Sequence, residues 1–315
     1  MSKKNYHIPV LLKEIIQNLK IKKNGIYVDC TFGSGGHSKN ILKKIGKHGF
    51  LYSLDKDPYS INFSKKIKNK NFKFINDSFE NLIKYAKKFN IIKKIDGIIL
   101  DLGFSTNQIK NKKRGFSFNL NGTLDMRYNQ KYGISAKKWI NNSNKKNIFK
   151  VIKKFGQEKF ASKISKAIVK YREKKKIEKT LELSEIINKI VYKKNRKINP
   201  STKTFQAIRI YINKELKCIK KILKDSLKIL SYKGKLLVIS FNSLEDRIVK
   251  YFMKSNSKNI NIPHKLPITY KKIKYLDEKK KLKIFKKILP SKKEVKKNIR
   301  SRSAILRIAE LKRIK

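Results

Sequence analysis

At Tyr27-Val28-Asp29-Cys30-Thr31-Phe32-Gly33-Ser34-Gly35-Gly36-His37-Ser38, an apolar strand runs into a glycine-rich loop and then into the start of a helix. Asp55 follows at the end of the next apolar run, residues 50–54. Glycines let a backbone approach a ligand closely, and a carboxylate one strand later can accept hydrogen bonds from both hydroxyls of a ribose. The stretch predicts a pocket for a nucleoside cofactor. On these residues alone, a dinucleotide and S-adenosylmethionine both remain open.

Around this loop, strand and helix patterns alternate. Apolar runs predict strands at residues 25–30, 50–54, 72–75 and 95–102, with a helix over residues 38–45. Runs that are apolar on both faces and separated by helices are typical of a parallel sheet with helices on both sides. Two later strands are predicted at residues 235–241, after a turn at Tyr232-Lys233-Gly234, and at residues 303–309. The fold class is therefore α/β, Rossmann-like and doubly wound.

The middle of the chain has a different period. Apolar residues recur at helical spacing over residues 148–155, 160–168 and 183–190. Pro200-Ser201-Thr202 provides start signals for a single long helix whose apolar face extends to Leu223. We interpret this as an all-helical domain, residues 108–212, inserted into a sheet domain formed by residues 1–107 and 213–315.

Composition narrows the class of protein. The chain of 315 residues carries 82 Lys and Arg against 22 Asp and Glu, a net charge of +60, which favours a polyanionic partner such as nucleic acid. Lys, Asn and Ile are all in excess together, so AT-rich codon usage accounts for part of that charge. Two separated cysteines and four scattered histidines predict no disulfide framework and no metal site. No apolar run is long enough for a membrane helix, and we expect a cytoplasmic protein.

Polar residues stand where three further strands end. Asn76-Asp77-Ser78-Phe79 follows the third strand and is suited to an adenine, although an ordinary turn explains it equally well. Asp101 ends the fourth strand, where it faces the reactive end of a cofactor or caps the next helix. After the fifth strand, Ser243 with Asp246 three residues later predicts a capping box.

Several long motifs together resemble the family of ribosomal small-subunit RNA methyltransferases H (MraW type). They cover the chain almost end to end: residues 7–12, 31–38, 96–105, 114–127, 202–210, 240–247 and 298–307. The resemblance implies a class I S-adenosylmethionine-dependent methyltransferase sheet with an inserted helical domain. It also implies methylation of the N4 amine of one cytidine in the decoding region of 16S rRNA, within the small ribosomal subunit, without a metal.

Carried over position by position, the resemblance implies a set of S-adenosylmethionine contacts. These are Gly35, Gly36 and His37 in the loop, Asp55 on the ribose, Phe79 by the adenine, and Asp101 with Gln108 near the methionine part. Asp101 is also the candidate for orienting the target amine. The sequence departs from the family pattern at Ser34, Thr106, Asn107, Thr123 and Asn242. Asn242 is the most consequential of these, because His is usual there and Asn cannot shuttle a proton.

Three other readings remain open on the sequence. One is a methyltransferase of another RNA or of DNA, which would share the sheet and the loop. A second is an RNA-binding ribosome-assembly factor without chemistry, which the intact set of Gly35, Gly36, Asp55 and Asp101 argues against. A third, an NAD-dependent oxidoreductase, has support only from the loop and Asp55.

Overall fold

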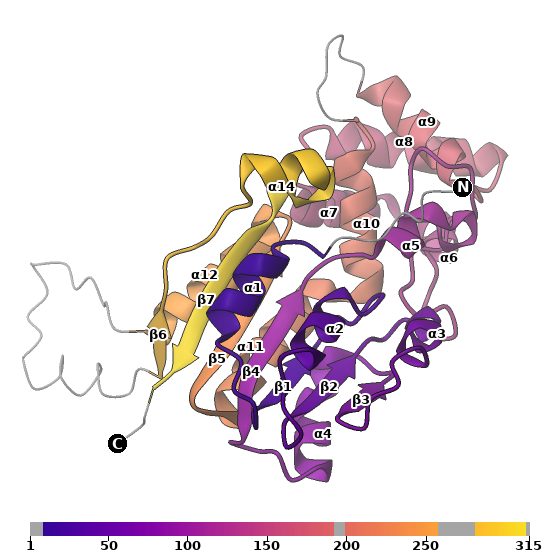
Figure 1. Ribbon diagram of the computed structural model, residues 1–315. Coiled ribbons are helices and arrows are strands. Elements are labelled where there is room, and N and C mark those ends of the chain that lie inside the picture. Colours follow the sequence, from indigo (N-terminus) through magenta and orange to yellow (C-terminus); the bar gives the residue numbers. More distant parts are fainter. Residues whose placement is uncertain (1–8, 192–198, 258–280, 313–315) are drawn as a thin grey trace, which may run out of the picture. The chain divides into compact units, whose positions relative to one another are not determined.

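One seven-stranded sheet organises the first and last parts of the chain, in the order β3-β2-β1-β4-β5-β7-β6 (Figure 1). The computed structural model describes residues 9–191, 199–257 and 281–312. The first five strands pair in parallel, and β7 pairs antiparallel with both β5 and β6. This order confirms the predicted class I methyltransferase sheet. The strands are β1 (Ile26–Asp29), β2 (Phe50–Leu54), β3 (Phe72–Ile75), β4 (Ile95–Asp101), β5 (Leu230–Ser240), β6 (Leu282–Ile284) and β7 (Ile305–Leu311).

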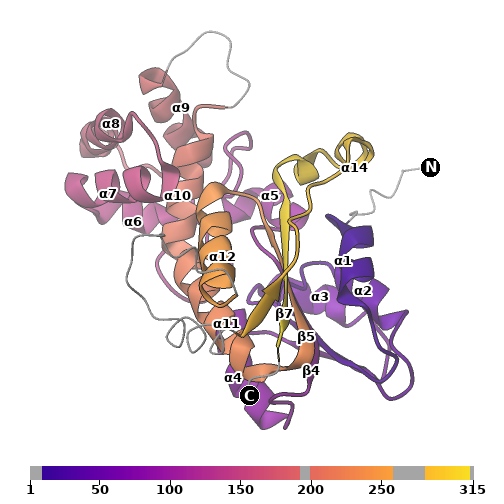
Figure 2. The ribbon, with the colours of Figure 1, turned by 90° about the vertical axis from the view of Figure 1, so that its left-hand side faces the viewer.

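Helices cover both faces of this sheet (Figure 2). On one face α1 (Leu12–Leu19) and α2 (Gly36–Leu42) bury Ile15, Leu19 and Ile41 against one apolar cluster. On the other face, α4 (Leu82–Lys88), α11 (Glu215–Ile229) and α12 (Ser243–Ser255) pack on a second cluster. Each fully buried Leu or Ile stabilises the fold by about 1.5–3 kcal/mol relative to leaving it exposed. The strands are apolar on both faces because both faces are covered. The described residues of the sheet part also form the short helices α3 (Ile61–Ser64) and α14 (Lys292–Lys297).

The helical part of the chain has its own core. The contacts divide the chain into two compact units, Met1–Gly103 with Leu216–Lys315, and Phe104–Glu215. In the second unit, Trp139, Ile152, Ile168 and Phe205 belong to an apolar cluster separate from those of the sheet. Its helices are α5 (Thr106–Lys110), α6 (Ala136–Asn142), α7 (Lys145–Gly156), α8 (Ala161–Lys174), α9 (Thr180–Ile190) and α10 (Thr202–Asn213).

The predicted single helix from Thr202 to Leu223 is wrong. α10 ends at Asn213, Lys214 takes a left-handed conformation with φ 53°, and α11 begins at Glu215. The Glu215 carboxylate is buried against the guanidinium of Arg209, with two hydrogen bonds of 2.9 and 3.0 Å. The break and this pair occur together, and periodicity alone gave no sign of either.

The structure continues β5 through residues 232–234, where the sequence predicts a turn, but the strand is irregular there. Pairing with β4 jumps from Ile95↔Leu230 to Gly97↔Lys235, and Lys233 has φ 63°. Regular pairing therefore starts at Lys235, as predicted, while the assigned strand starts earlier, at Leu230.

Candidate functional site

The glycine-rich loop joins β1 to α2 through two left-handed residues. Gly33 has φ 55° and Gly35 has φ 80°, a region that side-chain-bearing residues rarely adopt. Gly36 is required for a different reason, because a Cβ there would lie 2.4 Å from Cγ of Pro9. Gly36 and His37 form the first turn of α2. The predicted loop geometry thus brings the backbone of residues 33–36 to the carboxyl end of β1.

Asp55, at the carboxyl end of β2, accepts three hydrogen bonds within the sheet unit. Its Oδ2 accepts from the Gly33 amide at 2.7 Å and from the Ser60 hydroxyl at 3.0 Å. Its Oδ1 accepts from the Asp57 amide at 2.9 Å. Burial raises the pKa of Asp55 to about 6, although the hydrogen bonds from Asp57 and Gly33 oppose the rise. The carboxylate therefore joins the strand end to the glycine loop and keeps further acceptor capacity.

Phe79 lies after the carboxyl end of β3, at the start of a short 3-10 helix, Phe79–Asn81. Its ring is half-buried and packs partly against the apolar cluster beneath the sheet. In the preceding segment, Asp77 accepts hydrogen bonds from Asn81 and from the Tyr85 hydroxyl. The predicted adenine segment therefore also forms an internally bonded turn, and the outer part of the Phe79 ring is accessible.

Asp101, at the carboxyl end of β4, faces His37. The Nε2 of His37 lies 3.5 Å from the Asp101 Oδ2, and the histidine is buried. Both ring nitrogens of His37 and the Asp101 Oδ1 are buried without a hydrogen-bond partner in the described part of the chain. Burial alone would lower the pKa of His37, but the charges of Asp101, Asp29 and Glu294 outweigh it and raise that pKa. The sequence offered His37 no acid–base partner, whereas the structure brings a carboxylate to it.

Asp29 is a site residue that the sequence reasoning missed. It is fully buried at the end of β1, where its Oδ2 accepts from the Ser38 hydroxyl at 2.6 Å and its Oδ1 from the Thr31 amide at 3.1 Å. Burial raises the pKa of Asp29. The side chain thus ties the loop to the first turn of α2. The sequence did contain a signal for Asp29. It is a carboxylate residue at the end of an apolar strand, directly before the glycine loop.

Gln108 belongs to the other compact unit, Phe104–Glu215. The side-chain Oε1 of Gln108 accepts a hydrogen bond from the Ser105 backbone amide at 2.8 Å. The Gln108 backbone amide donates to the Ser105 hydroxyl at 3.3 Å. Together the two residues form the capping box of α5. Ser105, and not Asp101, therefore caps the helix that follows β4.

Asn242 caps the start of α12. Its Oδ1 accepts from the amides of Leu244 and Glu245, both at 3.1 Å. The predicted capping box between Ser243 and Asp246 is wrong. Ser243 is the first helical residue, and the Asp246 carboxylate instead binds the Arg307 guanidinium at 2.7 and 2.9 Å. Asn is among the best capping residues, whereas a side chain without a short acceptor is not.

The motif at residues 114–127 folds as a loop held by buried polar groups of the helical unit. The Arg114 guanidinium donates to the carbonyls of Arg127 and Tyr128 at 3.1 and 2.7 Å. Asp125 pairs with Arg127 at 2.6 Å, and Gly115 has φ 69°. The unusual composition of this segment, which the sequence left unexplained, follows from these bonds and this turn.

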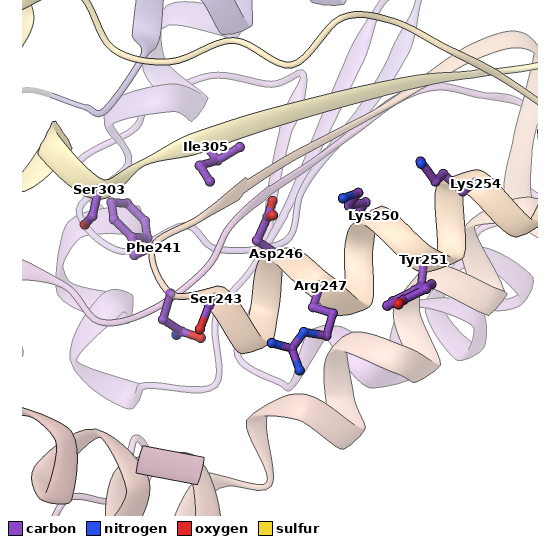
Figure 3. A pocket seen from close by; sticks show the side chains of 10 residues that line it. Phe241, Ser243, Asp246, Arg247, Lys250, Tyr251, Lys254, Ser303 and Ile305 are labelled. Atoms are coloured by element: carbon purple, nitrogen blue, oxygen red, sulfur yellow. The ribbon is translucent and has the colours of Figure 1, made fainter. Parts of the chain in front are cut away.

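A cavity of about 500 Å³ opens beside α12 and β7, within the sheet unit (Figure 3). Its lining includes Phe241 and Asn242 at the carboxyl end of β5, Asp246, and the cationic residues Arg247, Lys250 and Lys254. Among the described residues, no group of three His, Cys, Asp or Glu side chains is placed to hold a metal ion. None of the described helices has the length and apolar run that a bilayer crossing requires.

Comparison with known proteins agrees with this geometry. A family model described as the MraW methylase family matches residues 4–312. A protein of Buchnera aphidicola subsp. Cinara cedri, named ribosomal RNA small subunit methyltransferase H, is 56% identical over 305 residues, covering 97% of this chain and 99% of that protein. Proteins of the same name from Wigglesworthia glossinidia brevipalpis and Blochmanniella pennsylvanica are 53% and 48% identical, each over 96% of this chain and over 98% and 93% of their own lengths. The match includes residues 7 and 8 of the first motif, which lie outside the described residues. With a family model and relatives that both span nearly all of its length, the chain belongs to the MraW methylase family.

Proposed function

We propose that this protein uses S-adenosylmethionine to methylate ribosomal RNA, and that its target is the N4 amine of one cytidine in the decoding region of 16S rRNA. Family membership and the names of the relatives support the reaction and the class of RNA. The observation that carries the site is the His37–Asp101 pair at the carboxyl end of β4, with its unpaired buried atoms. Ligands of open α/β sheets bind at that edge.

The residues present fit the cofactor. Buried polar atoms without partners, such as the Asp101 Oδ1, are costly unless a ligand satisfies them. We assign Gly35, Gly36 and His37 to the backbone approach, Asp55 to the ribose hydroxyls and Phe79 to the adenine face. We assign Asp101 and Gln108 to the methionine part.

Asp101 has a second role towards the substrate. S-adenosylmethionine supplies a methyl group already activated on a sulfonium, whereas the cytosine amine is a poor nucleophile because its lone pair is delocalised into the ring. A hydrogen bond donated by that amine to the Asp101 carboxylate turns the lone pair towards the methyl. Alignment of this kind supplies on the order of 7–11 kcal/mol of barrier reduction. His37, whose Nε2 lies 3.5 Å from the Asp101 Oδ2, holds the carboxylate in place.

Asn242 has no acid–base role in this scheme. An amide cannot take up or release a proton near neutral pH, and its oxygen already accepts from two backbone amides. We therefore infer that this position supplies no base in this protein; the alternative is an enzyme slowed by the change from the usual His.

The target base must leave its stack to reach this edge, at a cost of about a few kcal/mol, and the surrounding RNA must be held. We assign that role to the helical domain of residues 108–212 and to the basic surface, in line with a net charge of +60. The small ribosomal subunit is the form of the RNA that we expect as substrate, and the cytoplasm is the compartment.

The test is methylation of unmodified small subunits by the purified protein with labelled S-adenosylmethionine, with the modified nucleotide mapped by mass spectrometry. N4-methylcytidine at a single position is the expected product. A product on another base, on DNA or none at all would overturn the assignment.

Asp101→Asn tests the site itself. We expect methylation at saturating S-adenosylmethionine to slow by about a hundredfold, since loss of alignment carries that cost. The pKa of His37, followed by NMR, should fall because the carboxylate that raises it has lost its charge. Asp96→Asn is the matched control, because Asp96 lies at the opposite end of β4 beside Lys22. Equal rates for Asp101→Asn and wild type would remove Asp101 from the mechanism.

A further inference from the structure

The outer surface of α12 carries two adjacent rows of side chains. Within each row, neighbouring side chains are about one helical turn apart. Ser243, Arg247 and Tyr251 recur at every fourth residue, and Asp246, Lys250 and Lys254 form the adjacent row. Figure 3 shows Arg247 and Tyr251 leaving one side of the helix and Lys250 and Lys254 leaving another. All of these residues line the cavity beside α12. We call Arg247, Lys250, Tyr251 and Lys254 the α12 groove.

The cations of this groove are not used by the fold. Arg247, Lys250 and Lys254 are exposed, and no carboxylate among the described residues lies within ion-pair distance of any of them. The nearest acid on the helix, Asp246, is held by Arg307 through two hydrogen bonds. Asp246 also interacts electrostatically with Lys250, but none of the three cations forms an ion pair with a carboxylate in the described part of the chain. Three exposed positive charges therefore line this cavity.

Tyr251 adds an aromatic stacking surface to the cations of the α12 groove. Its side chain is 68% exposed, which is unusual for a large aromatic residue of a helix that is otherwise packed on a sheet. An exposed aromatic ring between cations is the combination that binds single-stranded nucleic acid, because the ring stacks on a base while the cations contact phosphates. A peptide of acidic residues would use the charges but not the ring.

The groove starts next to the candidate reaction site within the same compact unit. Asp101 pairs with Ile239 across β4 and β5, and the Leu102 amide donates to the Ile239 carbonyl at 3.0 Å. Phe241, which lines the same cavity as the α12 groove, follows Ile239 by two residues. A strand of RNA that places a base near Asp101 therefore has the α12 groove as its continuation along the sheet unit.

We infer that the α12 groove binds the single-stranded RNA that flanks the methylated nucleotide, with Arg247, Lys250 and Lys254 on phosphates and Tyr251 stacked on an unpaired base. This inference rests on the proposed function for the identity of the RNA. The α12 groove is then an RNA-binding surface of the sheet unit, in addition to the surface proposed on the helical domain.

The first test removes two charges without touching the sheet core. Lys250→Ala/Lys254→Ala is compared with Lys84→Ala/Lys88→Ala, an exposed lysine pair of the same spacing on α4. Binding of a fluorescein-labelled RNA fragment that spans the target cytidine is measured by anisotropy at several salt concentrations. Each lost phosphate contact lowers the salt slope by about 0.7, so the α12 pair should lower it by about 1.4. The ratio of the RNA dissociation constant of the α12 variant to that of the wild type should then shrink about sevenfold between 50 and 200 mM salt.

The second test separates stacking from charge. Tyr251→Ala should weaken RNA binding by roughly 5- to 150-fold with an unchanged salt slope, whereas Tyr251→Phe should bind within about twofold of wild type. Thermal unfolding checks that every variant is folded.

The outcomes distinguish the groove from general basicity and from the proposed function. Equal losses in the α12 and α4 pairs, or no loss in either, would overturn the groove. Full binding by Tyr251→Ala would remove the stacking contact. Methylation of small subunits is measured in parallel. A wild type that binds RNA through α12 but methylates nothing would sink the proposed function and leave the groove, whereas methylation that is unaffected by all α12 variants would sink the groove alone.

Discussion

At the scale of single residues, Asp55 serves both the fold and the proposed ligand. Three protein donors already hold its carboxylate, from Gly33, Asp57 and Ser60. These bonds fix the glycine loop against the end of β2, so the loop backbone and the carboxylate, which we propose as contacts of the cofactor and its ribose, are held together. The burial that makes this possible also raises the pKa of the carboxyl to about 6.

The raised pKa predicts a pH dependence of cofactor binding. Ribose hydroxyls donate to the ionised carboxylate, which is lost as the pH falls through about 6. The affinity for S-adenosylmethionine should therefore be constant above pH 7 and fall by about tenfold by pH 5, one pH unit below that pKa. Calorimetric titration at each pH measures this. Asp55→Asn, which has no charge to lose, should bind more weakly and show a flat profile; a flat profile in the wild type would contradict the assignment.

The sequence predicted these site residues unequally. The positions of Gly35, Asp55 and Asp101 at the loop and at two strand ends could be predicted, because apolar runs and glycine turns are visible in one continuous stretch of sequence. Their roles towards a cofactor stay predictions. The sequence did not reveal that His37 faces Asp101, because His37 lies in the first turn of α2 and Asp101 ends β4, 64 residues later in the chain. The parallel pairing of β1 with β4 brings the two segments together. The same holds for Arg209 with Glu215, which requires the helix break at Lys214.

At the scale of elements, the start of α12 depends on one side chain. Asn242 alone accepts two of the amides that a helix start leaves unpaired. We expect Asn242→Ala to lower the free energy of unfolding by about 1 kcal/mol and Asn242→Asp to leave it nearly unchanged. Urea unfolding measures both. Ser243→Ala, at the position where the sequence predicted the cap, is the control and should stay within about 0.5 kcal/mol. A larger loss at Ser243 than at Asn242 would reverse the assignment.

The junction of α10 and α11 depends on a buried ion pair. Arg209 and Glu215 are both buried and the Tyr128 hydroxyl donates to the Glu215 Oε1 at 3.1 Å. Arg209→Leu leaves the Glu215 charge without its partner and should lower the free energy of unfolding by about 3–5 kcal/mol. The same substitution at exposed Arg247 should cost less than about 0.5 kcal/mol. Similar midpoints for the two variants in urea would show that the pair does not stabilise the junction.

At the scale of the whole molecule, charge and cofactor binding are expected to respond differently to salt. A net charge of +60 attracts any polyanion, whereas the S-adenosylmethionine contacts proposed above are local and largely buried. We expect kcat/KM for the RNA to fall at least tenfold between 50 and 200 mM salt, because several phosphate contacts are released together. The dissociation constant of S-adenosylmethionine, measured in the same buffers, should change less than about twofold. A kcat/KM that does not change with salt would show that the positive charge does not contribute to RNA binding and reflects codon usage.

The position of β7 between β5 and β6 sets an order of events during synthesis. The helical unit is contiguous from Phe104 to Glu215, so all its residues leave the ribosome before those of β7 (Ile305–Leu311) are made. At about 5–20 residues per second, the delay is on the order of 5–20 s. β5 ends at Ser240, so for the last part of that interval, on the order of 3–13 s, it has no antiparallel neighbour. The nascent polypeptide therefore contains the complete helical unit while the sheet still lacks its antiparallel strands β6 and β7.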